Sequence, residues 1–174
     1  MAIEPGTYRL GPEDGTLTVH TRRTGTVAKA GHDLVLHVTE WSATLTVGDE
    51  PAVTLDADAT SLRVRKGSGG LKPLDDDDYS NIEQTIDDEV LKRQDIAFRS
   101  TGAEATRDGL HVTGDLTLRG ATRPIAFDLA IAGSRLTGSA VVKQTDWGMK
   151  PYTALFGALK VADEVVVEVE GQSR

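Results

Sequence analysis

Four histidines and several strand-borne aspartates are the side chains of this chain best suited to chemistry. His32 and Asp33 are adjacent at the start of a predicted strand, where the carboxylate can orient the imidazole. This leaves two interpretations of His32: a polar contact to a ligand, or a turn histidine bonded to backbone. His37 lies an odd number of positions after His32, which places the two rings on opposite faces of a strand and predicts no metal site. We expect His20, His37 and His111 at the surface.

Catalysis is not indicated by the rest of the pattern. The absence of cysteine excludes thiolate chemistry and cysteine-bound metals, and no Gly-x-Ser-x-Gly sequence is present to carry a nucleophilic serine. Asp56, Asp58, Asp115 and Asp128 lie on predicted strands, but nothing in the spacing selects two of them as an acid–base pair. We therefore predict a protein that is not an enzyme, with no catalytic residue, no metal and no cofactor. Among the hypotheses for the function of the protein, an enzyme that acts on a bound ligand through His32 and Asp33 ranks third, behind two non-enzymatic ones.

Aromatic side chains gather in a predicted loop before the last strand. The loop holds Trp147, Tyr152 and Phe156, together with Met149 and Leu155. Such a cluster can cap the mouth of a barrel and line an apolar pocket, or it can act as a plug that packs on the core. Both interpretations remain open at the level of the sequence.

The elements that must position these side chains are mostly strands, because long stretches alternate between apolar and polar residues. The clearest is Gly114–Ile131, a predicted hairpin with Pro124 at the start of its second strand, since proline cannot donate to a ladder. In an earlier strand, Leu17, Val19 and Thr21 share one face. The predicted strands cover residues 6–10, 16–23, 33–47, 53–64, 94–98, 110–118, 125–131, 135–145 and 161–170.

One helix interrupts the strands, and an acidic run precedes it. Asp75–Asp78 resembles a calcium ligand set, but an EF-hand loop needs oxygen ligands spread over about twelve residues, with a central glycine and a final glutamate. We interpret the run as a solvated stretch that places negative charge near the helix start. The helix is predicted over residues 80–92 from the four-residue spacing of apolar side chains across Ile82–Val90, with Ser80 and Glu83 as a capping box.

The number and kind of elements predict an all-β fold. About eight strands and one helix favour an antiparallel sandwich or a closed barrel, and segment 33–47 forms either one long strand or two halves joined by a kink. A barrel of eight strands can hold a small ligand inside. The length of 174 residues fits a single domain over residues 1–174.

Composition excludes several classes of partner. A formal net charge of −8 argues against nucleic-acid binding and against docking on anionic membranes. No run approaches the ~20 apolar residues of a membrane helix, so we expect a protein that is not membrane-embedded. The N-terminal residues lack the basic and apolar regions of a signal peptide, which leads us to expect a cytoplasmic protein.

Three segments carry a resemblance to a known family. They are the run Gly-Asp-Leu-Thr-Leu-Arg-Gly-Ala-Thr-Arg-Pro-Ile at Gly114–Ile125, the segment Thr145–Met149, and Ala162–Val165 in the last strand. Together with the order of elements over residues 6–171, they resemble the YceI-like family. The resemblance implies a lipocalin-like, extended eight-stranded antiparallel β-barrel, often a homodimer, that binds a polyisoprenoid or similar amphiphile in its lumen.

We therefore expect a protein that binds an amphiphilic lipid, a polyisoprenoid or isoprenoid quinone, for storage or transport. The alternative is a structural or stress-related barrel with a packed interior and no lipid ligand, whose only partners are dimer contacts. The predicted ligand-binding residues face inward from strands or lie near a mouth. They are Leu17, Val19, His32, Leu36, Val38, Phe98, Leu116, Leu118, Phe127, Leu129, Val142, Trp147 and Phe156.

Overall fold

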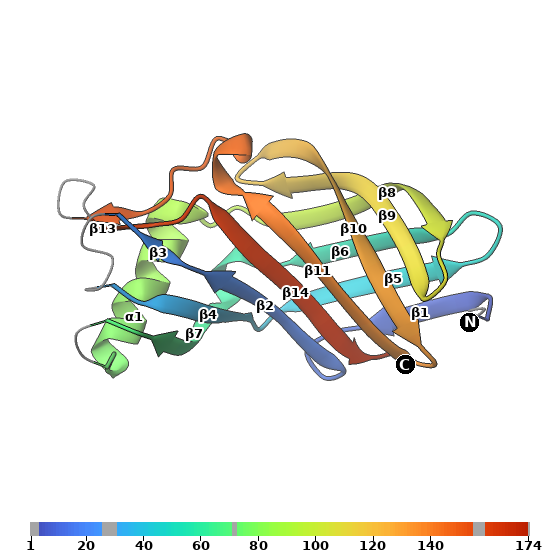
Figure 1. The fold of residues 1–174 in the computed structure, drawn as a ribbon, viewed down its shortest axis with the longest axis horizontal. Helices are drawn as coiled ribbons and strands as arrows, with labels where there is room; N and C mark the ends of the chain where they lie inside the picture. Colours follow the sequence, from blue (N-terminus) through green and yellow to red (C-terminus); the bar gives the residue numbers. More distant parts are fainter. Residues whose placement is uncertain (1–3, 26–30, 71–72, 155–158, 174) are drawn as a thin grey trace.

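The computed structural model describes residues 4–25, 31–70, 73–154 and 159–173 (Figure 1). Eleven strands form one antiparallel sheet in the order β1-β5-β6-β8-β9-β10-β11-β14-β2-β4-β7, and β12, β13 and β3 form a small second sheet. The strands are β1 (Gly6–Leu10), β2 (Gly15–Thr21), β3 (Arg23–Thr24), β4 (Asp33–Val38), β5 (Trp41–Val47), β6 (Ala52–Ala57), β7 (Leu62–Ser68), β8 (Ile96–Ala105), β9 (Gly109–Leu118), β10 (Ala121–Ala132), β11 (Arg135–Lys143), β12 (Thr153–Ala154), β13 (Leu159–Val161) and β14 (Glu164–Gln172).

The large sheet curls into a half-barrel around an apolar interior, with the single α-helix at one end and both chain termini at the other (Figure 1). Strand β4 continues into β5 through Thr39 and Glu40. The first half of this segment pairs with β2 and β7, whereas the second half pairs with β1 and β6. The segment 33–47 therefore links both ends of the strand order, which is why the sheet surrounds its interior.

The strand count of eight is wrong, because segments that alternate without a break in sequence are divided in the structure. Segment 53–64 becomes β6 and β7, separated by the 3-10 turn η2 (Ala59–Ser61). Asp58 caps this turn, since its Oδ1 accepts a hydrogen bond from the Thr60 backbone N–H at 2.8 Å. Segment 33–47 takes the kinked form, because the backbone N–H of Thr39 donates to the carbonyl of Ser61 at 2.9 Å. The two breaks thus lie side by side and bend neighbouring strands at the same place.

The helix begins earlier than the sequence indicated. α1 (Asp76–Thr85) is capped by Asp75, whose Oδ1 accepts from the Asp78 N–H at 2.8 Å while the Asp78 Oδ2 accepts from the Asp75 N–H at 3.0 Å. The predicted cap at Ser80 is therefore wrong, because the acidic run itself forms the capping box and the first turn, where carboxylates are favoured by the helix dipole. The π-helical turn η3 (Ile86–Val90) follows. Within the described ranges, no helix is long and apolar enough to cross a membrane.

The predicted central hairpin is present as β9 and β10, with Leu118 paired to Ala121. Its turn is Arg119–Gly120, with φ values of 50° and 76°, as a two-residue hairpin turn requires. Pro124 is not at the strand start as predicted but is the fourth residue of β10, paired with Asp115. Strand β10 pairs with β11 only from Asp128 onward among the described residues, so Pro124 lies where one side of β10 needs no ladder donor.

Candidate functional site

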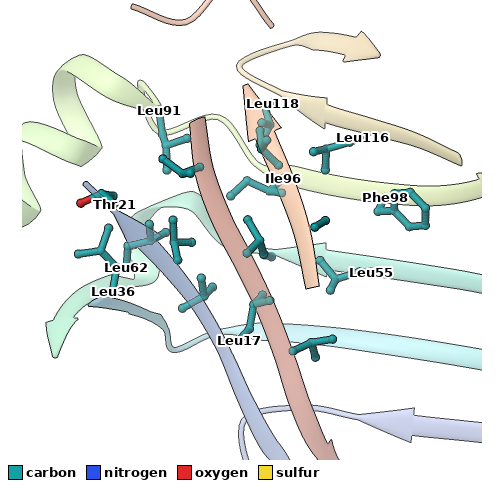
Figure 2. Close-up of a pocket in the computed structure, with 18 of the residues that line it drawn as sticks. Leu17, Thr21, Leu36, Leu55, Leu62, Leu91, Ile96, Phe98, Leu116 and Leu118 are labelled. Carbon is teal, nitrogen blue, oxygen red and sulfur yellow. The ribbon is translucent and has the colours of Figure 1, made fainter. Parts of the chain in front are cut away.

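The inner face of the curled sheet encloses a cavity of about 450 Å³ (Figure 2). Its wall is built from the inward-facing residues of most strands of the large sheet, because alternate side chains of a strand point to the same face. α1 and η3 complete the wall at one end. The volume lies within the range of about 300–1,000 Å³ that is common for small-molecule pockets.

The wall is almost entirely aliphatic and aromatic. Polar side chains on it are few, and among the described residues none of the wall side chains is charged. The polar wall residues are Thr21, Thr44, Asn81, Thr85, Ser139, Gln144 and Tyr152. Burying the apolar surface of a ligand against such a wall stabilises the complex by about 25 cal/mol per Å². The described wall residues offer no counter-charge to an ionised group.

Ten of the thirteen residues singled out from the sequence lie on this wall. They are Leu17, Val19, Leu36, Val38, Phe98, Leu116, Leu118, Phe127, Leu129 and Val142. Period-two alternation was enough to identify them, because each strand presents its apolar set to the interior and its polar set to solvent.

His32, which we expect to contact a ligand, is not among the described residues that line the cavity. A Cβ atom at Gly70 would lie 2.4 Å from the His32 Nε2, so the ring packs against that glycine. The neighbouring Asp33 uses its Oδ1 to accept a hydrogen bond from the Arg23 backbone N–H at 2.8 Å. His32 thus lies directly before β4, and Asp33 is the first residue of that strand.

The aromatic loop is divided between core and cavity. Trp147 is 5% exposed, is not part of the described wall, and donates from its Nε1 to the carbonyl of Leu116 at 2.8 Å. For Trp147 the plug interpretation therefore holds. Met149 is buried on the wall, and Tyr152 is on the wall although its side chain is 45% exposed. Phe156 lies outside the described residues.

The three segments that carried the family resemblance meet in one hydrogen-bonded cluster. Leu116 of β9 accepts from Trp147, and Thr145 in the same turn as Trp147 donates from N and Oγ1 to the carboxylate of Asp163, at 2.8 and 2.6 Å. Burial raises the pKa of Asp163, but the hydrogen bonds from Thr145 and the charge of Lys143 outweigh it and leave the pKa below its usual value. These segments thus hold the wall in place and do not themselves form a polar site.

The helix contributes wall residues that sequence analysis did not assign to the site. Asn81, Ile82, Thr85, Ile86 and Val90 all reach the cavity from α1 and η3. The four-residue spacing of the apolar members was visible in the sequence and identified a helix face. Only the tertiary structure shows that this face covers the end of the cavity.

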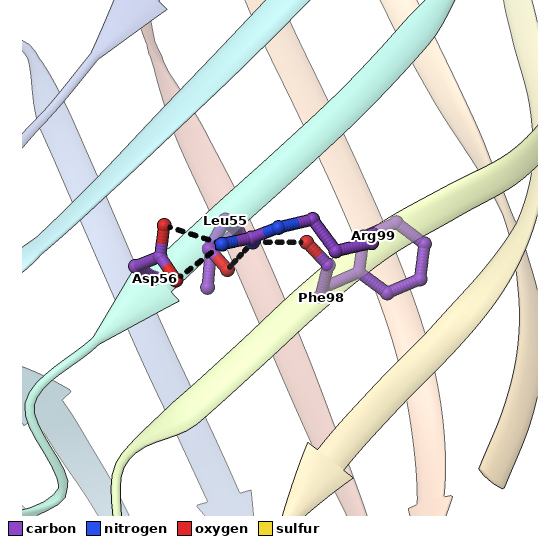
Figure 3. A network of polar contacts seen from close by, with 4 residues as sticks. All are labelled: Leu55, Asp56, Phe98 and Arg99. Atoms are coloured by element: carbon purple, nitrogen blue, oxygen red, sulfur yellow. Dashed lines mark hydrogen bonds and ion pairs between the residues drawn. The ribbon is translucent and has the colours of Figure 1, made fainter. Parts of the chain in front are cut away.

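Asp56, Asp128 and His111 have structural partners on the outer surface. Arg99 donates from Nη2 to both carboxylate oxygens of Asp56, at 2.9 and 3.1 Å, and from Nη1 to the carbonyls of Leu55 and Phe98 (Figure 3). The His111 Nδ1 lies 2.7 Å from an Asp128 oxygen. Both pairs link neighbouring strands across the outer face.

Two further histidines complete this surface. The His20 Nε2 is 3.2 Å from a Glu168 oxygen. Burial and, to a lesser degree, the nearby Arg65 charge lower the pKa of His37. In the part of the chain that the structure describes, no three histidine, aspartate or glutamate side chains gather in a way that could hold a metal ion.

Comparisons with known proteins agree with this architecture. The crystal structure of Burkholderia cenocepacia BcnA is similar with a TM-score of 0.63 at 17% identity, covering 90% of this chain and 94% of that chain. The Campylobacter jejuni YCEI protein is similar with a TM-score of 0.62 at 14% identity, covering 80% and 84%. At these identities the likeness concerns the fold.

Sequence relatives lead to the same family. The UPF0312 protein of Pseudomonas aeruginosa strain LESB58 is 30% identical over 92 residues, and the protein of that name in strain UCBPP-PA14 matches equally. The match spans about half of this chain and about half of each relative, 47% in both cases. The model of the YceI-like domain matches residues 8–173. The chain belongs to the YceI-like domain family.

Proposed function

We propose that this protein binds the apolar chain of an amphiphilic lipid, a polyisoprenoid or an isoprenoid quinone, inside the curled sheet, and stores or transports it without chemical change. The observation that carries this proposal is the cavity of about 450 Å³, whose described wall residues are uncharged and mainly aliphatic. The barrel-like fold and the family are consistent with a ligand-binding role. The alternative of a barrel with a packed interior fits a cavity of this size poorly, because packed protein cores leave few voids larger than a water molecule.

The energetics favour a long chain over a short one. Burial contributes about 0.8 kcal/mol per CH₂, or roughly 4 kcal/mol for a five-carbon isoprenoid unit. Association costs an estimated 4–15 kcal/mol in lost freedom, so one unit cannot give useful affinity and several are required. Branched, unsaturated chains suit a wall of Leu, Val, Ile and Phe side chains that interdigitate with methyl groups.

Native mass spectrometry of the gently purified protein, followed by lipid extraction, tests the proposal. We expect an adduct that dissociates on activation and an extract that contains an isoprenoid lipid. The delipidated protein should then be titrated with prenyl alcohols of increasing length while the melting temperature is followed. Absence of any adduct, together with a melting temperature that no chain length shifts, would overturn the proposal.

A further inference from the structure

The pairing between β10 and β11 ends before either strand does. The last pair of their ladder is Asp128 with Ser139. Among the described residues, the rest of β10, 121–127, pairs with β9 alone, and the rest of β11, 140–143, pairs with β14 alone. Figure 1 shows the two strands close together toward the chain termini and spread apart at their other ends. The wall of the half-barrel therefore contains a wedge-shaped split between these two segments.

The sequence itself contributes to this split through Pro124. The backbone N–H of Ile131 donates to the carbonyl of Asp108 at 2.8 Å, on the β9 side of β10. Backbone groups alternate in direction along a strand, so odd-numbered residues of β10 turn toward β9 and even-numbered residues turn toward β11. Pro124 is even-numbered and has no N–H to donate. A ladder across the split would therefore lack a donor midway along its length.

Both edges of the split belong to the cavity wall. Ile125 and Phe127 reach the cavity from β10, and Ala140 and Val142 reach it from β11. No ladder pair joins these two edges among the described residues, so their side chains can move apart without breaking one. Parting two laddered strands elsewhere in the wall would leave main-chain N–H and carbonyl groups without partners, which destabilises a fold. The split is thus the part of the wall that opens with the least loss of hydrogen bonding.

At the narrow end of the split, the cavity comes close to the outer surface. Four residues border both the cavity and an open hollow on the outer face of the sheet, namely Leu129, Gly138, Ser139 and Val169. Glycine and serine leave this part of the wall with little side-chain bulk.

At the wide end, a turn holds the split together. The turn η4 (Gln144–Trp147) follows β11 directly and contacts β10. Trp147 donates from its Nε1 to the carbonyl of Leu116 on β9 at 2.8 Å. This bond ties the end of β11 across β10 to β9, so the split is fixed at both ends and is free to widen between them.

We infer that the split between residues 121–127 and residues 140–143 is the portal through which an apolar chain enters and leaves the cavity. The inference rests on the proposed function. The chain passes between Phe127 and Ala140, whose side chains move apart while the ladder and the Trp147 bond hold the strands at either end. Exchange of the ligand then needs neither the unfolding of a strand nor a movement of α1.

The cysteine-free chain allows the split to be locked by one engineered bridge. Ala126 and Val141 are exposed and would face each other if the register of the ladder continued. The variant Ala126→Cys/Val141→Cys is bridged with a short bis-methanethiosulfonate linker, which a reducing agent removes. The control Val141→Cys/Val166→Cys carries the same linker between β11 and β14, where Val141 and Val166 are paired.

The probe is a benzoquinone with a farnesyl substituent, whose binding to the delipidated full chain is followed by stopped-flow quenching of tryptophan fluorescence. Bridging Ala126→Cys/Val141→Cys should lower the association and dissociation rate constants together, at least about tenfold, with Kd within about twofold of wild type. A closed portal raises the barrier to exchange but leaves the bound state unchanged, whereas a disturbed wall changes Kd. Reduction should restore both rates, and the bridged control should bind at wild-type rates.

Amide hydrogen exchange of the ligand-free protein is a second measurement that needs no bridge. The backbone N–H groups of Ala126 and Val141 turn toward the split, where neither has a ladder partner among the described residues. Those of Ala130 and Thr137 lie in the ladder between the same two strands. We expect the first two amides to exchange at least about tenfold faster than the second two.

Three results would overturn the inference while leaving the proposed function intact. The first is a bridged Ala126→Cys/Val141→Cys variant that takes up and releases the probe at wild-type rates, which would place entry elsewhere in the wall. The second is equal slowing in the bridged control. The third is protection of the Ala126 and Val141 amides equal to that of Ala130 and Thr137, because the ladder would then be closed in solution. If the probe does not bind to the wild type, both the proposed function and the inference fail.

Discussion

The ring centroids of Phe98 and Phe127 lie 5.3 Å apart with the planes inclined at 60°, and both side chains line the cavity. They come from β8 and β10, which flank β9, and Gly114 of β9 lies midway between Val112, the partner of Phe127, and Leu116, the partner of Phe98. A Cβ atom at Gly114 would lie 2.6 Å from the Phe98 Cζ and 2.5 Å from the carbonyl oxygen of Arg99. The first glycine of the sequence motif therefore makes room for an aromatic ring on the cavity wall.

Gly114→Ala should destabilise the protein by about 1–3 kcal/mol, as expected when a side chain is forced into a packed site. The measurement is urea unfolding followed by tryptophan fluorescence. Gly48→Ala is the matched control, because a Cβ there meets nothing within 4 Å, and it should be close to neutral. Equal stability of the two variants would show that the ring does not need the glycine.

Trp147→Phe should cost about 1–3 kcal/mol, because it leaves the buried carbonyl of Leu116 without its donor. Affinity for a lipid chain should stay within about twofold, since removing a group outside the wall costs no ligand contact. Trp41→Phe is the control for size, as Trp41 is similarly buried. A large loss of affinity at unchanged stability would instead place Trp147 at a mouth.

Ala140→Phe should abolish chain binding by filling the cavity, because Ala140 is on the wall. Val141→Phe provides the control at the next position, where the side chain is 58% exposed and points to the other face. At a ligand concentration of 100 Kd, wild type and Val141→Phe should gain about 2.7 kcal/mol, or roughly 5–10 °C in Tm. A matching gain in Ala140→Phe would locate the ligand elsewhere.

Asp58→Ala should destabilise by about 0.5–2 kcal/mol at neutral pH, the usual cost of removing a capping side chain. Hydrogen bonds from the Thr60 hydroxyl and N–H lower the pKa of Asp58 in the folded state. A lowered pKa stabilises the fold above the unfolded-state pKa, and this contribution is lost as pH falls through the folded-state value. The difference between wild type and Asp58→Ala in urea unfolding should therefore shrink below about pH 4.

Asp49 is exposed, and Asp49→Asn serves as the control for that experiment. The free energy of unfolding of this variant should stay close to that of wild type at both pH 7 and pH 3. A gap between wild type and Asp58→Ala that stays constant from pH 7 to pH 3 would mean that the turn does not depend on the ionised carboxylate.

Local patterns predicted much of the site but not its boundaries. Alternation identified wall residues such as Leu36 and Leu116, because strand periodicity is a property of the chain itself. The predicted helix cap is Ser80, whereas the cap in the structure is Asp75. The two capping patterns lie close together, and the sequence does not rank them. The sequence predicts that Asp33 orients the neighbouring His32 ring. In the structure, the Asp33 carboxylate instead accepts a hydrogen bond from the backbone N–H of Arg23.

By itself, the sequence determined which residues alternate, where the central hairpin lies and to which family the chain belongs, since these follow from short-range spacing and motif. Tertiary structure alone decided that the strands break together at Thr39 and Ser61, that α1 covers one end of the cavity, and that Trp147 bonds to Leu116. Such contacts join residues distant in the chain, and their energies depend on how the sheet curls.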